Sequence, residues 1–304
     1  MDRLRIDLNN KHSVGLGDNL CLLSALANIR SDVDLYVTNE HRTFDRLSQY
    51  KRIFKIPDQK IKIYQSETNG KFDNVGWPLK LFTEYYRPSQ VTLTGGSVRI
   101  RPNADKPCIA IAGFFDTPPA GNQNEWPWCK GRPLEFWGRV FAWIKSMGYD
   151  AISVDYPFHD LENKVELLAK HCKAIISYEG GMAHLSHMLQ LPCFLIDWKL
   201  PSPSTNLGGL HCDFVHRTNS VYIVRDDNEL FAWNRDQFDG KISDLLKGKT
   251  NNMLVNGSCS LKFEGPGPYG NMSIVDKDNN LMHTTSGLYG FNSEFSKLIE
   301  QQYF

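Results

Sequence analysis

The sequence of 304 residues lacks the features that mark membrane, secreted or disordered proteins. No run approaches the ~18 consecutive apolar residues of a membrane-spanning helix, so no membrane span is expected. The first residues, MDRLRIDLNN, lack the apolar core of a signal peptide, which predicts a cytoplasmic location. There is no long block of like charge and no low-complexity tract, and 12% of the residues are aromatic. Extensive disorder is therefore not expected.

The spacing of the cysteines is not that of a disulfide-rich protein or of a zinc site. The seven cysteines are an odd number and include no CxxC pair, which disfavours a disulfide framework and a zinc site. Cys108 and Cys193 lie inside apolar runs, where cysteine behaves as a small hydrophobic residue. We expect buried, reduced thiols.

The net charge is zero, but the two parts of the chain differ in sign. Residues 1–106 hold 17 Lys and Arg against 12 Asp and Glu, whereas residues 107–304 hold 17 against 22. A local basic run comprises Arg42, Arg46, Lys51, Arg52, Lys55, Lys60 and Lys62. It is either a solvated helix face or a surface that attracts an anionic partner.

Apolar periodicity predicts two α/β domains joined near residues 101–107, a polar stretch bracketed by prolines. Alternating strands and helices predict parallel sheets covered by helices. In the first domain we expect strands at 3–8, 33–37 and 61–64 and helices at 20–29 and 44–54. In the second we expect strands at 108–112, 151–154, 174–177, 193–197 and 222–224, and helices at 134–147, 161–171 and 183–189. The predicted domains are residues 1–104, residues 107–250, and a C-terminal extension, 251–304, with hairpins near 260–263 and 272–275 and a helix at 293–304.

The most informative segment is the turn Glu179-Gly180-Gly181-Met182-Ala183-His184, which links a predicted strand to a predicted helix. Two glycines allow a sharp turn and a close approach of the backbone to a ligand. The N–H groups at the start of the next helix have no partner within it and attract anions. Taken alone, the turn favours a purely structural role, since glycine turns between strand and helix are common.

A second such element follows the first predicted strand. Gly15-Leu16-Gly17-Asp18 lacks the third glycine of the dinucleotide-binding fingerprint. Asp18 lies near the start of a helix, where Asp is also favoured as an N-cap.

With these two motifs in this order, the sequence resembles the lipopolysaccharide heptosyltransferases, glycosyltransferase family nine. Residues 17–26 (GDNLCLLSAL) resemble the Gly-Asp loop and helix of that family. Residues 179–192 resemble its second-domain turn, His-Leu-Ala and Gly-x-Pro. Glu179 and Gly180 depart from the usual Asp and Ser or Thr. The family's Lys-x-Trp-Pro element is disturbed, with Lys130 the first and Arg132 the second choice for its cation.

The resemblance implies a GT-B fold, with two Rossmann-like doubly wound domains and a cleft between them. It implies inverting transfer of a sugar from a nucleoside-diphosphate sugar, without an obligatory metal, to a saccharide or other anionic acceptor. Asp18 would be the general base. The donor would be bound by residues Gly17, Lys130, Arg132, Glu179, Gly180, Gly181, Met182, Ala183 and His184. Within that set, Glu179 would accept from sugar hydroxyls, and His184 would either bind phosphate or pack its helix.

The sugar stays open between hexose, pentose and heptose. Other functions also stay open. A DNA glycosyltransferase acting on hydroxymethylated bases would use the basic run to contact phosphates, with nucleic acid as acceptor. A non-catalytic nucleotide-sugar-binding protein could share the fold. A non-hydrolysing sugar epimerase is disfavoured by the lack of a clear cluster of paired acids and bases.

Overall fold

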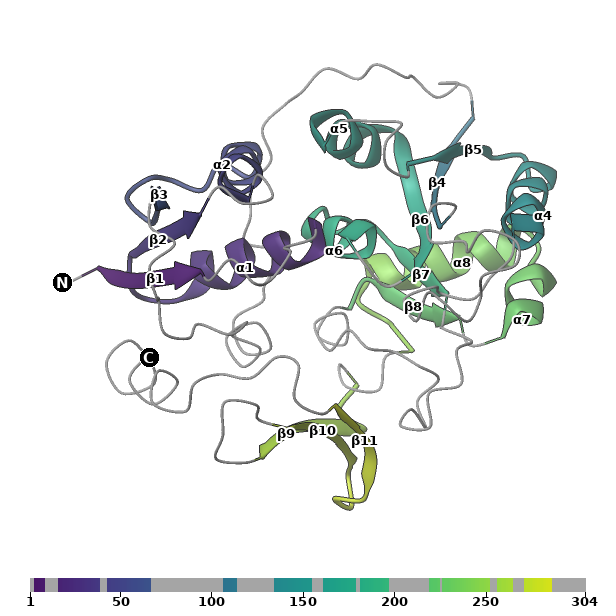
Figure 1. Cartoon of the computed structure of the whole chain (residues 1–304). Helices are drawn as coiled ribbons and strands as arrows, with labels where there is room; N and C mark the ends of the chain where they lie inside the picture. The colour runs from purple at the N-terminus through teal and green to yellow at the C-terminus, as the bar shows by residue number, and fades with distance from the viewer. Residues whose placement is uncertain are drawn as a thin grey trace. The chain divides into compact units, whose positions relative to one another are not determined.

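The computed structural model describes residues 3–8, 16–38, 43–66, 106–113, 134–154, 161–178, 181–196, 219–224, 226–251, 256–264 and 271–285. The chain divides into two compact units, one formed by Met1–Thr94 with Ser260–Phe304 and the other by Gly95–Cys259 (Figure 1). The domain boundaries at 104, 107 and 250 remain predictions. Among the described residues, no helix combines the length and the apolar stretch that crossing a membrane requires.

The first unit contains a parallel sheet of three described strands in the order β1-β2-β3. The strands are β1 (Leu4–Leu8), β2 (Val33–Thr38) and β3 (Ile61–Ser66), and the helices are α1 (Leu16–Asn28) and α2 (Thr43–Ile53). Leu20, Leu23 and Leu26 of α1 are fully buried, as their helical spacing predicts. Helix α1 begins four residues before the predicted start at residue 20. Burial of Gly17 in the first turn outweighs the low helix propensity of glycine.

The second unit is built on a five-stranded parallel sheet in the order β5-β4-β6-β7-β8. Its strands are β4 (Cys108–Ala112), β5 (Asp150–Ser153), β6 (Cys172–Tyr178), β7 (Cys193–Ile196) and β8 (Val221–Val224). Its helices are α4 (Leu134–Ser146), α5 (Leu161–His171), α6 (Gly181–Met188), α7 (Asp227–Ala232) and α8 (Arg235–Leu246). Every residue of β4 and β7 is buried, which is typical of strands covered on both faces.

One face of this sheet packs against α4, α7 and α8 through a core rich in aromatic rings. The Phe238 ring of α8 lies against the Phe194 ring of β7, with the ring centroids 4.7 Å apart and the planes tilted by 33°. Helices α5 and α6 cover the other face (Figure 1). The sheet is therefore doubly wound, and the fold class is the predicted one, a mixed α/β chain with two parallel sheets.

Two helices after residue 200, α7 and α8, were not predicted. Helix α8 begins with a capping box, in which the Asn234 side chain accepts from the Gln237 N–H and the Gln237 side chain accepts from the Asn234 N–H. Where hairpins are predicted, near 260–263 and 272–275, the structure has strands β9 (Cys259–Glu264) and β10 (Asn271–Asp276). A third strand, β11 (Leu281–Thr285), completes an antiparallel sheet and was missed. The predicted helix at 293–304 lies outside the described residues.

Four helices end in the same hydrogen-bonded motif. In each, one N–H bonds to the carbonyl five residues earlier and the preceding N–H bonds to the carbonyl three residues earlier. The residue that donates the second of these bonds has a left-handed backbone, for which glycine is preferred. Gly148 and Gly248 hold that position after α4 and α8, but Lys55 (φ 51°) and Gln190 (φ 54°) hold it after α2 and α6.

We therefore expect Gln190→Gly to raise the free energy of unfolding by about 0.5–1 kcal/mol, because glycine removes the clash of Cβ in the left-handed conformation. Gln190 is exposed, so little packing is lost. Urea denaturation measures the change. The converse substitution, Gly148→Ala, should lower stability by about 1 kcal/mol. Equal stability of wild type and Gln190→Gly would show that the conformation carries no cost.

Candidate functional site

The strand order of the second unit reverses between β4 and β6. The chain passes from β4 to β5 on one side and returns to β6 on the other, with Ala112 paired to Ser177 near the ends of the two strands. In open parallel sheets, ligands bind beyond the carboxyl ends of the strands at such a reversal. Lys130 and Arg132 lie in the segment after β4, and the glycine turn follows β6. Of the two predicted elements, the structure describes the second from Gly181 onward, and this part follows β6 at the reversal point.

Helix α6 begins at this reversal point, and two residues separate it from the end of β6. Its first residue is Gly181, so it starts earlier than the predicted residue 183. Gly181 and Met182 are half-buried, whereas Ala183 and His184 are buried. The first-turn N–H groups of an α-helix lack partners within the helix, and its N-terminus carries about half a positive charge. The half-exposed part of the turn is thus able to hold an anion through its backbone.

A buried indole ring lies at the carboxyl ends of β4 and β6. Trp137 of α4 is fully buried and lies against Gly113, the residue after β4, where an added Cβ would overlap the indole ring. The same indole meets the Tyr178 ring at the end of β6 edge to face, with the centroids 5.0 Å apart and the planes at 89°. These contacts fix the ends of β4 and β6 relative to α4.

Two histidines of α6 lie next to each other in the interior, with their ring centroids 6.3 Å apart. His187 is 1% exposed, and neither of its ring nitrogens has a hydrogen-bond partner within the described ranges. Burial, followed by repulsion from His184, lowers the pKa of His187 to about 3. His187 is therefore a neutral buried ring at physiological pH. No group of three or more His, Cys, Asp or Glu side chains in the described part of the chain is placed to hold a metal.

In the first unit, Gly17 and Asp18 lie in the first turn of α1, beyond the carboxyl end of β1. Asp18 is the third residue of this helix, so it does not precede the helix as an N-cap would. A carboxylate in the first turn is also favoured by the helix dipole. The base role of Asp18 stays a prediction.

The structure describes Gly17, Asp18 and the segment from Gly181 to His184 among the predicted site residues. Lys130, Arg132, Glu179 and Gly180 lie outside the described residues. Sequence reasoning did not find the support provided by Gly113 and Trp137. The only local signal was a glycine directly after the buried strand CIAIA.

Comparison with known proteins gives matches among solved structures alone. No family model and no curated protein matches the chain. The chain is similar to the dodecameric iron-containing heptosyltransferase TibC in complex with ADP-D-β-D-heptose, at 14% identity and a TM-score of 0.42, covering 82% of this chain and 77% of that one. A second TibC structure, from enterotoxigenic E. coli H10407, matches at 14% identity and a TM-score of 0.38, covering 80% and 75%. E. coli heptosyltransferase WaaC with ADP matches at 12% identity and a TM-score of 0.36, covering 82% and 99%.

The contact between Gly113 and Trp137 predicts opposite effects for two Gly→Ala changes. Gly113→Ala should lower the free energy of unfolding by about 1–3 kcal/mol, because the methyl group overpacks against the indole. Gly138→Ala is the matched control, since an added Cβ there meets nothing within 4 Å and alanine favours the helix. Urea denaturation of both variants measures the difference. A Gly113→Ala protein as stable as wild type would contradict the described contact.

The buried His187 ring predicts a pH dependence of stability. Its pKa is about 3 in the folded state and 6.5 in the unfolded chain, so between these values the unfolded chain binds one more proton. The contribution of the neutral ring is fully present above pH 6.5 and is lost at up to about 1.4 kcal/mol per unit as pH falls.

In His187→Leu that part of the slope should disappear between pH 6 and pH 4, as measured by urea denaturation at a series of pH values. His171→Gln, which changes an exposed histidine, should keep the wild-type slope. An unchanged slope in His187→Leu would show that the ring is protonated in the folded state.

Proposed function

We propose that the chain is a nucleotide-sugar-dependent glycosyltransferase that moves a sugar from a nucleoside diphosphate to an acceptor hydroxyl with inversion. The carrying observation is the start of α6 at the reversal point of a five-stranded parallel sheet. This position joins a backbone anion site with the place where such sheets bind nucleotides. The resemblance of residues 17–26 and 179–192 to the heptosyltransferase motifs supports the assignment of the reaction.

Donor binding is assigned to the second unit. The N–H groups of Gly181, Met182 and Ala183 hold the diphosphate, with Lys130 or Arg132 supplying a cation. These donors stabilise the negative charge that grows on the diphosphate as the bond to the sugar breaks. His184 supports this turn from within the core, where it is 4% exposed. Glu179 accepts hydrogen bonds from the sugar.

The acceptor is assigned to the first unit, with Asp18 as the general base and Gly17 beside it at the start of α1. The carboxylate removes the proton of the acceptor hydroxyl as its oxygen attacks the anomeric carbon. The bond from that carbon to the diphosphate oxygen breaks in the same step, so the configuration inverts. Proton transfer of this kind contributes about 10²–10⁴-fold to the rate.

We also propose a saccharide acceptor, independence from an added metal and a cytoplasmic location. The proposed location agrees with the free thiols of Cys108, Cys172 and Cys193, as a reducing compartment would leave them. Activity that persists in the presence of EDTA would support transfer without a metal, and its loss would contradict it.

The donor is identified first, by thermal denaturation with a panel of nucleoside diphosphates and their sugars. A ligand at 100-fold over its Kd should raise the free energy of unfolding by about 2.7 kcal/mol. Release of nucleoside diphosphate from the stabilising sugar, with and without saccharide acceptors, then measures turnover. Binding without any release would favour a non-catalytic binding protein.

Asp18→Asn should lower transfer by about 10²-fold or more while leaving nucleoside-diphosphate binding unchanged, because the amide cannot take the proton. Asp45→Asn is the matched control, since Asp45 is likewise the third residue of its helix, α2, and should keep wild-type turnover. Near wild-type turnover of Asp18→Asn would contradict the base role and leave Asp18 only a role in stabilising the helix end.

A further inference from the structure

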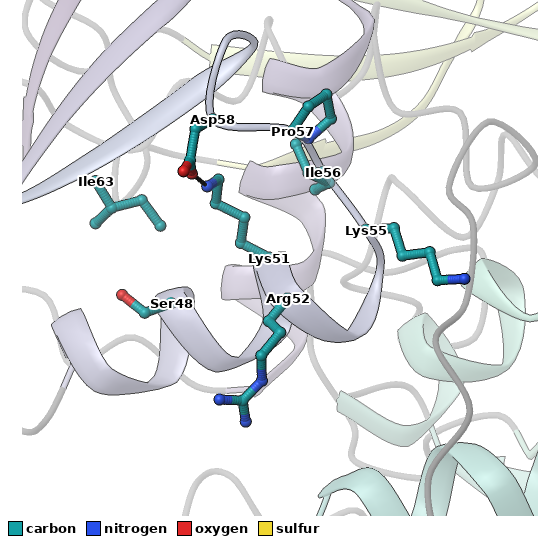
Figure 2. Close-up of a pocket in the computed structure, with 8 residues that line it drawn as sticks. All are labelled: Ser48, Lys51, Arg52, Lys55, Ile56, Pro57, Asp58 and Ile63. Atoms are coloured by element: carbon teal, nitrogen blue, oxygen red, sulfur yellow. Dashed lines mark hydrogen bonds and ion pairs between the residues drawn. The ribbon is translucent and has the colours of Figure 1, made fainter.

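A pocket of about 510 Å³ lies on the first unit, between the second half of α2 and the start of β3 (Figure 2). Residues 54–60 connect the end of α2 to the first residue of β3, so the pocket lies toward the amino edge of the parallel sheet. The first turn of α1, with Asp18, follows the carboxyl end of β1 at the opposite edge. Six residues of strand span about 20 Å. The pocket is therefore separate from the site proposed for acceptor activation.

Positive charge dominates this pocket, which is lined by Lys51, Arg52 and Lys55 against one acid, Asp58. In Figure 2 the Lys51 ammonium points to the Asp58 carboxylate, and the two form an ion pair. The Lys51 side chain is 13% exposed and that of Asp58 79%, so the cation is the more buried partner of this pair. The hydrogen bond from Lys51 holds the pKa of Asp58 below its usual value. An anionic ligand of this pocket would therefore compete with the Asp58 carboxylate for the Lys51 ammonium.

Not every cation of the basic run lines this pocket. The Lys60 ammonium donates to the carbonyls of Ile29 and Ser31, the latter at 2.8 Å, and so ties the start of β3 to the end of α1. Burial lowers the pKa of Lys60, as expected for a cation used inside the fold. Arg52 and Lys55, in contrast, are exposed, and in Figure 2 their side chains extend in different directions, away from the pair formed by Lys51 and Asp58.

Lys55 holds its place on the rim at a structural cost. It occupies the left-handed position after α2 (φ 51°), where α4 and α8 have glycine. Gln190 has the same strained backbone after α6, so the strain belongs to the helix-end motif and does not by itself mark a binding residue. Among the described residues, none forms an ion pair with the Lys55 ammonium. The side chain thus adds charge to the pocket without a role in holding the helix end.

We propose that this pocket binds the phosphate group of a small phosphorylated ligand, such as a sugar phosphate. Lys51, Arg52 and Lys55 supply the charge that a phosphate dianion requires. Ile56 and Pro57 provide apolar walls for the rest of the ligand. The volume is in the usual range for small-molecule sites.

Isothermal titration at low salt with glucose 6-phosphate, inorganic phosphate and glucose tests the proposal. Glucose 6-phosphate should bind and glucose should not. Weaker binding of inorganic phosphate than of glucose 6-phosphate would assign part of the affinity to the walls, and equal binding would assign the site to phosphate alone. Binding of glucose equal to that of glucose 6-phosphate would overturn the proposal.

Lys55→Gly should weaken glucose 6-phosphate binding about three- to tenfold, while the urea midpoint of unfolding stays equal or rises. Gln190→Gly removes the same backbone strain in the second unit and should leave binding unchanged. Lys55→Arg keeps the charge and should bind within about twofold of wild type. Wild-type affinity in Lys55→Gly would overturn the proposal.

Asp58→Asn should strengthen binding about three- to tenfold, because it frees the Lys51 ammonium. Unchanged or weaker binding in this variant would contradict the role of Asp58 as a competing anion. Displacement of glucose 6-phosphate by duplex DNA, with a steep loss of DNA binding in salt, would assign the surface to nucleic acid instead. Each readout is binding in the first unit and is independent of sugar transfer, of Asp18 and of nucleotide binding to α6.

Discussion

The parallel pairing of β4 with β6 is the constraint on which the second unit depends. These strands come from segments about sixty residues apart, and between them the chain has already formed α4, β5 and α5. Their adjacency creates the reversal of strand order, and the reversal creates the place beyond the strand ends where α6 begins. The indole of Trp137 holds both ends through Gly113 and Tyr178. The candidate site is thus a consequence of sheet topology before any side chain contributes to it.

The ends of the helices illustrate how the same backbone geometry is reached with different residues. Gly148 and Gly248 adopt the left-handed conformation at little cost, whereas Lys55 and Gln190 adopt it against the preference of their Cβ atoms. In both non-glycine cases a buried aliphatic residue and then a proline follow directly, Ile56-Pro57 and Leu191-Pro192. Burial of the aliphatic side chain and the fixed proline backbone define the exit of the chain where the residue type does not.

The sequence predicted the elements whose signals are local. The run Cys108–Ala112 predicts a central strand because continuous apolar residues need cover on both faces, and it is buried throughout. Propensity predicts starts for α1 and α6 that are too late, because it places Gly17 and Gly181 in loops, whereas both residues lie in helices. Helix α8 carries a local signal for its start in Asn234 and Gln237, which form its capping box. The contact of Trp137 with Gly113 joins segments 24 positions apart and has no local signature.

The buried ends of β4 and β6 also limit which amino-acid substitutions the protein is able to accept during evolution. Trp137 leaves no space above Gly113, so the strand end cannot shift along its neighbour without moving the whole of α4. The half-exposed first turn of α6 is not covered by this contact. This contact thus restricts which substitutions are tolerated at Gly113. A chain of this kind is able to acquire a different ligand preference by changing its loops while the sheet edge that presents them stays the same.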